Sequence, residues 1–336
     1  MALFTEVFQD VTKIGRKIPT SEYLENGKYP IIDQGQSDIA GYTNEESGLF
    51  TDVPVVIFGD HTRAVKYVDV PFFLGADGVK VLKANSEDMN HKYLYYVLCS
   101  ANIPDTGYNR HFKWLKEIDI PNYSLKEQNL VIENLDKISS LIEQRKQQLS
   151  KLDELVKARF VEMFGDIYET SEWDKKPWSE LVTIQNGRDY KNILVESGGY
   201  PVYGTGGEMA RASDYLCPEN TIIVGRKGTI NNPLLVKEKF WNVDTAFGVI
   251  VGKQMHYQYF YNFCRMFDFS TLNKQAVLPS TTKADLLKIE IAVPPIELQN
   301  QFAAFVEQID KSKLSIQQSL EKLETLKKSL MQQYFG

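Results

Sequence analysis

The sequence predicts an α+β protein in which two β-rich globular domains alternate with two long helices. The helices are expected to pair as an antiparallel coiled coil with pseudo-two-fold symmetry. Three observations lead to this architecture: a repeat at constant offset, short runs of β-forming residues, and two stretches of helical periodicity. The 336 residues are 43% apolar and 24% charged, which suits a two-domain globular chain.

The repeat relates positions that lie 171 residues apart. The stretch KLDELVKARFVEMFG, from Lys151, shares six identities with KLETLKKSLMQQYFG, from Lys322. The same offset aligns KYPIIDQGQ with GYPVYGTGG and LKEIDIPNYSLKEQN with LLKIEIAVPPIELQN. IGRK, from Ile14, is a looser match for NGRD, from Asn186. A constant offset over separate segments indicates a tandem duplication.

Residues 1–124 and 166–294 are the two β-rich domains in this interpretation. Both contain short runs rich in Val, Ile, Tyr and Phe, such as VPVVIFGD in the first domain and NTIIVGRKGT in the second. Gly, Pro and Asn separate these runs. Such a pattern is typical of strands joined by turns.

Residues 125–165 and 295–336 contain the two expected spacer helices. From Leu125 and from Ile296, about 40 residues have no proline, and glycine only at the end. Their apolar residues recur at alternating three- and four-residue spacing, which predicts a helix roughly 60 Å long. The predicted seam consists of Leu135, Ile138, Ile142, Leu149, Leu152 and Val156 in the first helix, and Ile309, Ile316, Leu320, Leu323 and Leu330 in the second.

Charged residues interrupt the seam at different positions in the two helices. Arg145 aligns with Ile316, and Ile142 aligns with Lys313. Two helices that differ in this way favour an intramolecular pair over the identical helices of a homodimer. Packing of each helix on its own domain is the alternative.

Few features of the sequence point to an enzyme. The four histidines have no metal-ligand spacing, and YGTGGE, from Tyr203, is not a dinucleotide-binding G-x-G-x-x-G motif. Cys99, Cys217 and Cys264 are isolated, which indicates reduced cysteines in a cytoplasmic protein. The sequence shows neither a signal-peptide pattern nor an apolar run of about 18 residues, so no membrane span is expected.

Donor-rich loops in both domains suggest contacts with nucleic acid, because their side chains suit phosphates and base edges. A solvated surface turn is the alternative interpretation of each loop. The candidate residues are Arg63, Asn109, Arg110, His111 and Lys113 in the first domain, and Arg226, Lys227, Thr229, Asn273, Lys274, Gln275, Thr281, Thr282 and Lys283 in the second.

Charge alone does not favour a lone DNA-binding domain. Residues 1–124 hold 12 basic and 17 acidic groups, and residues 172–294 hold 14 basic and 13 acidic groups. Affinity for nucleic acid depends strongly on neutralisation of phosphates. We therefore expect the basic side chains to gather on one face, or other subunits to supply most of the phosphate contacts.

Over its whole length the chain resembles the specificity subunit of type I restriction–modification enzymes. The resemblance lies in a variable globule, a short IP…L-x-E-Q segment and a long helix that ends in FG, all present twice. In the second copy Leu298 stands opposite Glu127, which departs from the pattern. The residues that carry the resemblance are Ile120, Pro121, Leu125, Glu127, Gln128 and Gly165 in the first copy, and Pro294, Pro295, Ile296, Gln299 and Gly336 in the second.

This resemblance implies that each globule is a target recognition domain that reads one half of a bipartite site in double-stranded DNA. The helices would set the distance between the half-sites. The resemblance also implies no catalytic residue, metal or cofactor in this chain. S-adenosylmethionine and ATP would belong to partners: two DNA adenine methyltransferase subunits, and restriction (translocase/nuclease) subunits. A non-catalytic scaffold whose globules bind proteins is an alternative, and an uncharacterised enzyme is a weaker one.

Overall fold

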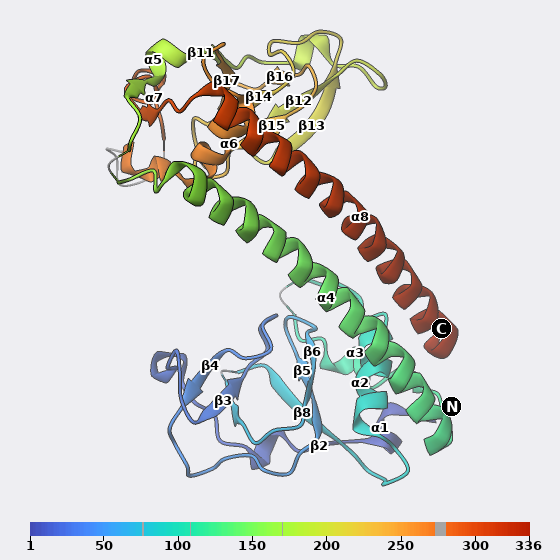
Figure 1. Ribbon diagram of the computed structural model, residues 1–336. Helices are drawn as coiled ribbons and strands as arrows, with labels where there is room; N and C mark the ends of the chain where they lie inside the picture. The colour runs from blue at the N-terminus through green and yellow to red at the C-terminus, as the bar shows by residue number, and fades with distance from the viewer. Residues whose placement is uncertain (76, 108, 170, 273–279) are drawn as a thin grey trace. The chain divides into compact units, whose positions relative to one another are not determined.

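The computed structural model describes residues 1–336 with the exception of residues 76, 108, 170 and 273–279. The chain divides into two compact units: unit 1 comprises Met1–Lys146 and Gln318–Gly336, and unit 2 comprises Gln147–Gln317. Two helices of 40 residues each, α4 (Leu125–Phe164) and α8 (Ile296–Phe335), run from one unit into the other (Figure 1). Each unit therefore holds one β-rich domain and a portion of both long helices.

The β-rich domain of unit 1 is built on a four-stranded sheet with the order β2-β8-β5-β6 and a three-stranded sheet with the order β4-β3-β7. A two-stranded ladder joins β1 to β9. Besides α4, its elements are β1 (Ala2–Leu3), α1 (Phe4–Val7), β2 (Phe8–Asp10), β3 (Tyr29–Ile32), β4 (Gly41–Thr43), β5 (Val55–Gly59), β6 (Val65–Val68), β7 (Phe73–Leu74), β8 (Val79–Ala84), α2 (His91–Ser100), α3 (Phe112–Leu115) and β9 (Asp119–Ile120), with 3₁₀ turns at Thr12–Ile14 and Thr20–Glu22.

The β-rich domain of unit 2 repeats this plan, with sheet orders β11-β17-β14-β15 and β13-β12-β16 and a ladder of β10 with β18. Besides α8, its elements are β10 (Lys175–Pro177), α5 (Trp178–Leu181), β11 (Val182–Asn186), β12 (Tyr200–Gly204), β13 (Gly207–Ala212), β14 (Thr221–Gly225), β15 (Leu234–Val236), β16 (Trp241–Asn242), β17 (Ala246–Val251), α6 (Tyr257–Met266), α7 (Lys283–Leu286) and β18 (Glu290–Ala292), with 3₁₀ turns at Lys191–Ile193 and Phe269–Leu272.

The strands β5 and β14 hold the same place in the two domains. Each is an inner strand of its four-stranded sheet, and each buries all five of its residues, VVIFG and TIIVG. Such a run has no polar face, so both faces of the strand are covered. The predicted α+β class, with two tandem β-rich domains and two long helices, is confirmed.

The two long helices run antiparallel within unit 1. Asn134 Nδ2 donates a hydrogen bond to the hydroxyl of Tyr334 at 3.0 Å, and Lys146 Nζ lies 3.8 Å from a carboxylate oxygen of Glu324. Residue numbers therefore rise along α4 as they fall along α8. In unit 2 the other halves of the same helices also contact each other, through the rings of Phe160 and Phe302, whose centroids lie 5.5 Å apart.

None of the predicted seam residues is exposed. Leu135, Ile138, Ile142, Val156 and Leu320 are buried, and the remaining seam residues are half-buried. Leu135 belongs to the core of the first domain, and Val156 belongs to that of the second. The helices therefore pack on their own domains as well as on each other, so both interpretations of the apolar stripe describe part of the structure.

Two buried glutamines attach the long helices to their domains. Gln128 Oε1 accepts a hydrogen bond from the backbone N–H of Asn90 at 2.9 Å, and its Nε2 donates to the carbonyl oxygen of Tyr123 at 2.8 Å. Gln299 Oε1 likewise accepts from the backbone N–H of His256 at 2.7 Å. Buried polar groups need such partners, which gives a physical reason for glutamine at this position in both copies.

The departure from the repeat at Leu298 has a local explanation. At the start of α4, Ser124 and Glu127 form a capping box, with Ser124 N donating to Glu127 Oε2 at 2.8 Å and Glu127 N donating to Ser124 Oγ at 3.4 Å. In the second copy Pro295 precedes α8, and proline has no N–H for a glutamate to satisfy. Leu298 is therefore compatible with the start of α8.

Candidate nucleic-acid interface

In unit 1, buried Asp60 joins the loop after β5 to the start of α3. Its backbone N–H donates to the carbonyl oxygen of Gly78 at 2.7 Å. Its own carbonyl oxygen accepts from the backbone N–H of His111 at 2.7 Å and faces the ring Nδ1 of His111 at 3.0 Å. Its carboxylate accepts from the backbone N–H of Phe112 at 2.7 Å. Asp60, Gly78 and the start of α3 at His111 and Phe112 therefore meet where β5 ends and β8 begins.

Gln34 adds a further loop at this point. Its side-chain Oε1 accepts from the backbone N–H of His61 at 3.2 Å, and its Nε2 donates to the carbonyl oxygen of Asp77 at 2.9 Å. Buried Lys66 fixes the same loop, because its Nζ donates to the carbonyl oxygens of Asp33 at 2.8 Å and Ser37 at 2.6 Å. Burial lowers the pKa of Lys66, and the carboxylate of Asp33 opposes this effect.

The predicted DNA contacts of unit 1 fall into two groups: side chains exposed to solvent, and side chains that bind to other groups of the same unit. Asn109, Arg110 and Lys113 are exposed. Arg63 is half-buried, and its guanidinium lies 2.6 Å from a carboxylate oxygen of Asp105. His111 is 1% exposed. Its ring lies between the carbonyl oxygen of Asp60 at 3.0 Å and the hydroxyl of Thr106 at 3.3 Å, so His111 holds these loops together, and its contact with DNA stays a prediction.

Arg63 and Asp105 stabilise the loop that leads to the exposed group. Arg63 has a backbone φ of 61°, which is unusual for a residue with a side chain. Its guanidinium also donates to the carbonyl oxygen of Ile103 at 3.3 Å. The backbone N–H of Gly107 and the charge of Arg63 lower the pKa of Asp105. The charge of Arg63 is therefore neutralised locally, whereas Arg110 and Lys113 are exposed to solvent.

In unit 2, Arg226 occupies the place that Asp60 has in unit 1. Its backbone N–H donates to the carbonyl oxygen of Thr245 at 2.9 Å, and its carbonyl oxygen accepts from the backbone N–H of Thr281 at 3.0 Å. The hydroxyl of Thr281 donates to the carbonyl oxygen of Gly225 at 2.6 Å. Thr281 is 3% exposed and, like His111, holds the loops together. Its contact with DNA likewise stays a prediction.

The remaining described candidates of unit 2 are exposed: Arg226, Lys227, Thr229, Thr282 and Lys283. Thr282 caps α7 by accepting from the backbone N–H of Asp285 at 3.1 Å. Lys283 Nζ donates to the carbonyl oxygen of Ile184 at 2.8 Å, which brings the start of α7 to the middle of β11. Asn273, Lys274 and Gln275 lie outside the described residues.

The guanidinium of Arg226 has a defined direction. One of its Nη atoms donates to the carbonyl oxygen of Asp244 at 3.3 Å, and its centre lies 5.9 Å from the centroid of the Phe247 ring. A guanidinium held in this way has fewer orientations to lose on binding, which favours the directional contact that a base edge requires.

In each unit, the loops joined by these backbone hydrogen bonds form what we call the backbone frame. Sequence reasoning missed three residues that hold the frame in place: Asp60, Gln34 and, in unit 2, Asn242. Asn242 is fully buried, and its Nδ2 donates to the carbonyl oxygens of Ala246 at 3.0 Å and Gln185 at 3.3 Å. These residues carry no motif. Apart from Ala246, the partners named above are distant in sequence, so the one available signal was the place of these residues directly after or between short apolar runs.

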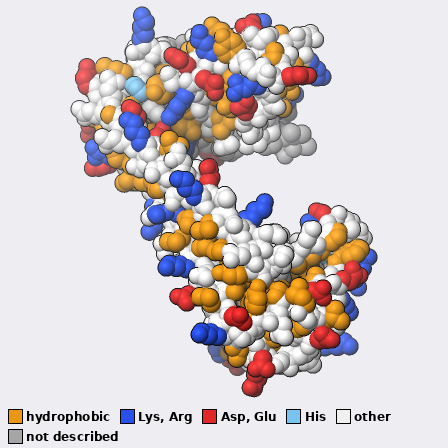
Figure 2. All heavy atoms as spheres, turned by 90° about the vertical axis from the view of Figure 1, so that its right-hand side faces the viewer, with side chains coloured by type: hydrophobic (Ala, Val, Ile, Leu, Met, Phe, Trp, Pro, Cys, Tyr) orange, Lys and Arg blue, Asp and Glu red, His pale blue; other side chains and the backbone are white. Residues whose placement is uncertain are grey.

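Charge is mixed on one face of the molecule. On the face drawn in Figure 2, Lys and Arg side chains alternate with Asp and Glu side chains on each unit. A mixed surface gives weak non-specific attraction to DNA. The face drawn is therefore not a broad basic surface.

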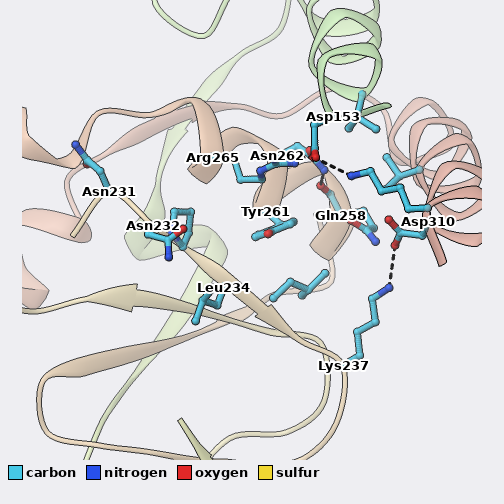
Figure 3. A pocket seen from close by; sticks show the side chains of 15 residues that line it. Asp153, Asn231, Asn232, Leu234, Lys237, Gln258, Tyr261, Asn262, Arg265 and Asp310 are labelled. Carbon is cyan, nitrogen blue, oxygen red and sulfur yellow. Dashed lines mark hydrogen bonds and ion pairs between the residues drawn. The ribbon is translucent and has the colours of Figure 1, made fainter. Parts of the chain in front are cut away.

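Unit 2 also contains a polar hollow of about 390 Å³ lined by α4, α6, α8 and the segment that leads into β15 (Figure 3). Its charged groups satisfy each other. Asp153 lies 2.8 Å from Lys313 and 3.0 Å from Arg265, and Lys237 lies 2.9 Å from Asp310. This internal neutralisation gives the hollow the character of a structural ionic network.

Two chemical features are absent from the described part of the chain. No group of three or more His, Cys, Asp or Glu side chains there is arranged to hold a metal ion. None of the helices in that part is long and apolar enough to cross a membrane.

Comparison with known proteins gives a family for both halves of the chain. The model of the type I restriction modification DNA specificity domain matches residues 5–153 and again residues 170–327. The specificity subunit of the type I restriction enzyme EcoR124I/EcoR124II from Escherichia coli is 28% identical over 137 residues. That match covers 37% of this chain and 34% of the relative, so this chain spans about a third of the relative's length.

Two solved structures share the fold. The S subunit of a type I restriction–modification system from M. genitalium superposes with a TM-score of 0.65 at 16% identity, covering 99% of this chain and 95% of that chain. A chain from a structure concerned with complex assembly and conformational transition of the type I R-M system superposes with a TM-score of 0.57 at 14% identity, covering 99% and 96%. At these low identities, both comparisons support the fold of this chain alone.

Proposed function

Because this chain belongs to the type I restriction modification DNA specificity family, we propose that it is the sequence-specific DNA-binding subunit of a type I restriction–modification complex. Each unit reads one half of a bipartite DNA target. The long helices α4 and α8 fix the distance between the two half-sites.

One observation carries this proposal: the two units hold different side chains in the same backbone frame. The residue after the inner strand is Asp60 in unit 1 and Arg226 in unit 2, and both are fixed by equivalent backbone hydrogen bonds. The residue that closes the frame is His111 in unit 1 and Thr281 in unit 2. A duplicated frame with unequal side chains suits two readers of different sequences.

The long helices offer equivalent docking positions for two copies of a partner. Leu155 on α4 and Leu326 on α8 lie 171 positions apart and are 46% and 48% exposed. Large exposed apolar side chains at repeated positions favour contact with two identical protein subunits. We propose that these are DNA adenine methyltransferase subunits, with restriction subunits joining the assembly.

This chain then contributes recognition and assembly, and its partners carry the chemistry. S-adenosylmethionine and ATP bind to those partner subunits, and this chain has no catalytic residue of its own. The assembly works in the cytoplasm, where the host DNA lies.

Methylation mapping tests the proposal. The chain is expressed in a host together with a methyltransferase subunit of the type I family from the same source, and modified adenines are mapped across the genome. We expect a split motif with a constant unspecified gap, which disappears when this chain is omitted. A soluble, co-purified complex that adds no methylation would contradict the proposal and favour a protein-binding scaffold.

A further inference from the structure

Arg188, in the loop after β11, is an exposed arginine that the predicted contacts did not include. Its backbone is held on both sides. The N–H of Arg188 donates to the carbonyl oxygen of Asn242 at 3.0 Å, and its carbonyl oxygen accepts from the indole N–H of Trp241 at 2.9 Å. The backbone of Arg188 is therefore fixed beside Trp241 and Asn242 of β16, and only its side chain can move.

The glycine before it allows this close approach. A Cβ atom on Gly187 would lie 1.8 Å from the carbonyl oxygen of Val243, a distance that no side chain tolerates. The loop 242–245 that receives Arg188 also holds Arg226, through the carbonyl oxygens of Asp244 and Thr245. The two arginines are therefore anchored to opposite ends of the same short segment.

The guanidinium of Arg188 has no hydrogen-bond or ion-pair partner among the described residues. The acidic neighbour, Asp189, is engaged elsewhere, because its carboxylate accepts from the backbone N–H of Lys191 at 3.0 Å. The guanidinium of Arg188 is thus exposed and without a direct partner in the described part of the chain, and its backbone is attached to the segment that also holds Arg226.

The arginine of the looser match in unit 1 has a different environment. IGRK and NGRD align at an offset of 172, one more than the repeat, and set Arg16 opposite Arg188. The guanidinium of Arg16 lies 2.8 Å from a carboxylate oxygen of Glu45 and donates to the carbonyl oxygen of Ser47 at 3.2 Å. One copy of the repeated arginine is neutralised within its unit, and the other copy is not.

Building on the proposed function, we propose that Arg188 binds a backbone phosphate of the half-site read by unit 2, beside Arg226, which meets a base edge. The distinction follows from the two guanidinium groups. Arg226 is held in one direction by Asp244 and Phe247, as base reading requires. The backbone of Arg188 is fixed by hydrogen bonds, while its guanidinium has no partner in the described part of the chain. Such a side chain suits a phosphate, because that contact is mainly electrostatic.

The test measures binding of the assembled methyltransferase complex to two duplexes, one with the mapped target and one with an altered unit 2 half-site, over a range of salt concentrations. Arg188→Gln should weaken binding to both duplexes by the same factor. It should also reduce the magnitude of the slope of log K against log salt by about 0.9, the value for one phosphate contact. Arg188→Lys keeps the charge and should retain most of the slope.

Arg16→Gln is the matched control. Because Glu45 already neutralises Arg16, this variant should leave the slope unchanged. An unchanged slope in Arg188→Gln would overturn the inference, and so would a loss confined to the duplex with the correct half-site, which would make Arg188 a base reader. The proposed function fails separately, if the unsubstituted complex does not distinguish the two duplexes.

Discussion

Asp60 and Arg226 occupy the same position in two copies of one frame. The backbone N–H of Asp60 donates to Gly78, and that of Arg226 donates to Thr245, at 2.7 and 2.9 Å. The two side chains differ in charge and in direction: the carboxylate of Asp60 turns inward to the backbone of Phe112, while Arg226 is exposed. The frame is therefore a common support, and the side chains on it are free to differ between the units.

Loss of charge at Arg110 and Lys113 is expected to affect one half-site alone. Both side chains are exposed in unit 1, Arg110 just before α3 and Lys113 on α3 itself. The double variant Arg110→Gln/Lys113→Gln should weaken binding by about 1–3 kcal/mol if one of the two meets a base edge. Binding to duplexes altered in either half-site checks this. Equal loss of discrimination at both half-sites would contradict a two-reader account.

The exposed leucines of the long helices are expected to bind the methyltransferase subunits. Removing a half-buried leucine contact costs about 1 kcal/mol, or roughly fivefold in affinity. Leu155→Ser and Leu326→Ser should therefore each weaken one of the two docking events, as native mass spectrometry with a titrated partner would show. Leu130→Ser is the control, because Leu130 is 56% exposed and its counterpart in the repeat is Gln301. A control that weakens docking equally would remove the basis for assigning this surface.

The ionic network of unit 2 is expected to lose its contribution in acid. Burial by itself would raise the pKa of Asp153, but hydrogen bonds and charges from Lys313 and Arg265 outweigh it and lower the pKa below its ordinary value. A carboxylate with a lowered pKa stabilises the fold above its unfolded pKa of about 3.9, and the contribution disappears as pH falls through the folded pKa.

The stability difference between the wild type and Asp153→Asn should therefore be largest near neutral pH and shrink below about pH 4. Urea unfolding at several pH values measures it. Glu172→Gln, at an exposed carboxylate of the same unit, provides the comparison. A difference for Asp153→Asn that stays constant from pH 7 to pH 3 would exclude the ionic contribution.

The helices are expected to act as a ruler. Deletion of residues 145–151 and 316–322 removes one heptad from each helix, and so shortens each by about 10 Å while turning its faces by only about 20°. The unspecified gap in the methylated motif should shrink by about three base pairs, at 3.4 Å per step, with both half-sites unchanged. An unaltered gap in an active complex would show that another element sets the spacing.

The repeated architecture could be predicted from the sequence, because a tandem duplication leaves identical residues at a constant offset. The seam positions such as Leu135 and Val156 were also accessible, since helical spacing is local. The burial of His111 and Thr281 could not be predicted in this way. It depends on contacts with Asp60 and Gly225, which lie more than 50 positions earlier in the chain. A polar side chain before a short helix looks the same in sequence whether it faces solvent or a carbonyl oxygen.

The central claim, that each unit reads one half-site, is tested most directly by sequencing the DNA that the assembled complex selects from a randomised library, for the wild type and for Arg226→Gln. The wild type should select two short specified blocks separated by a constant gap. Arg226→Gln should relax one block and leave the other intact. A single continuous block, or equal relaxation of both blocks, would contradict the account.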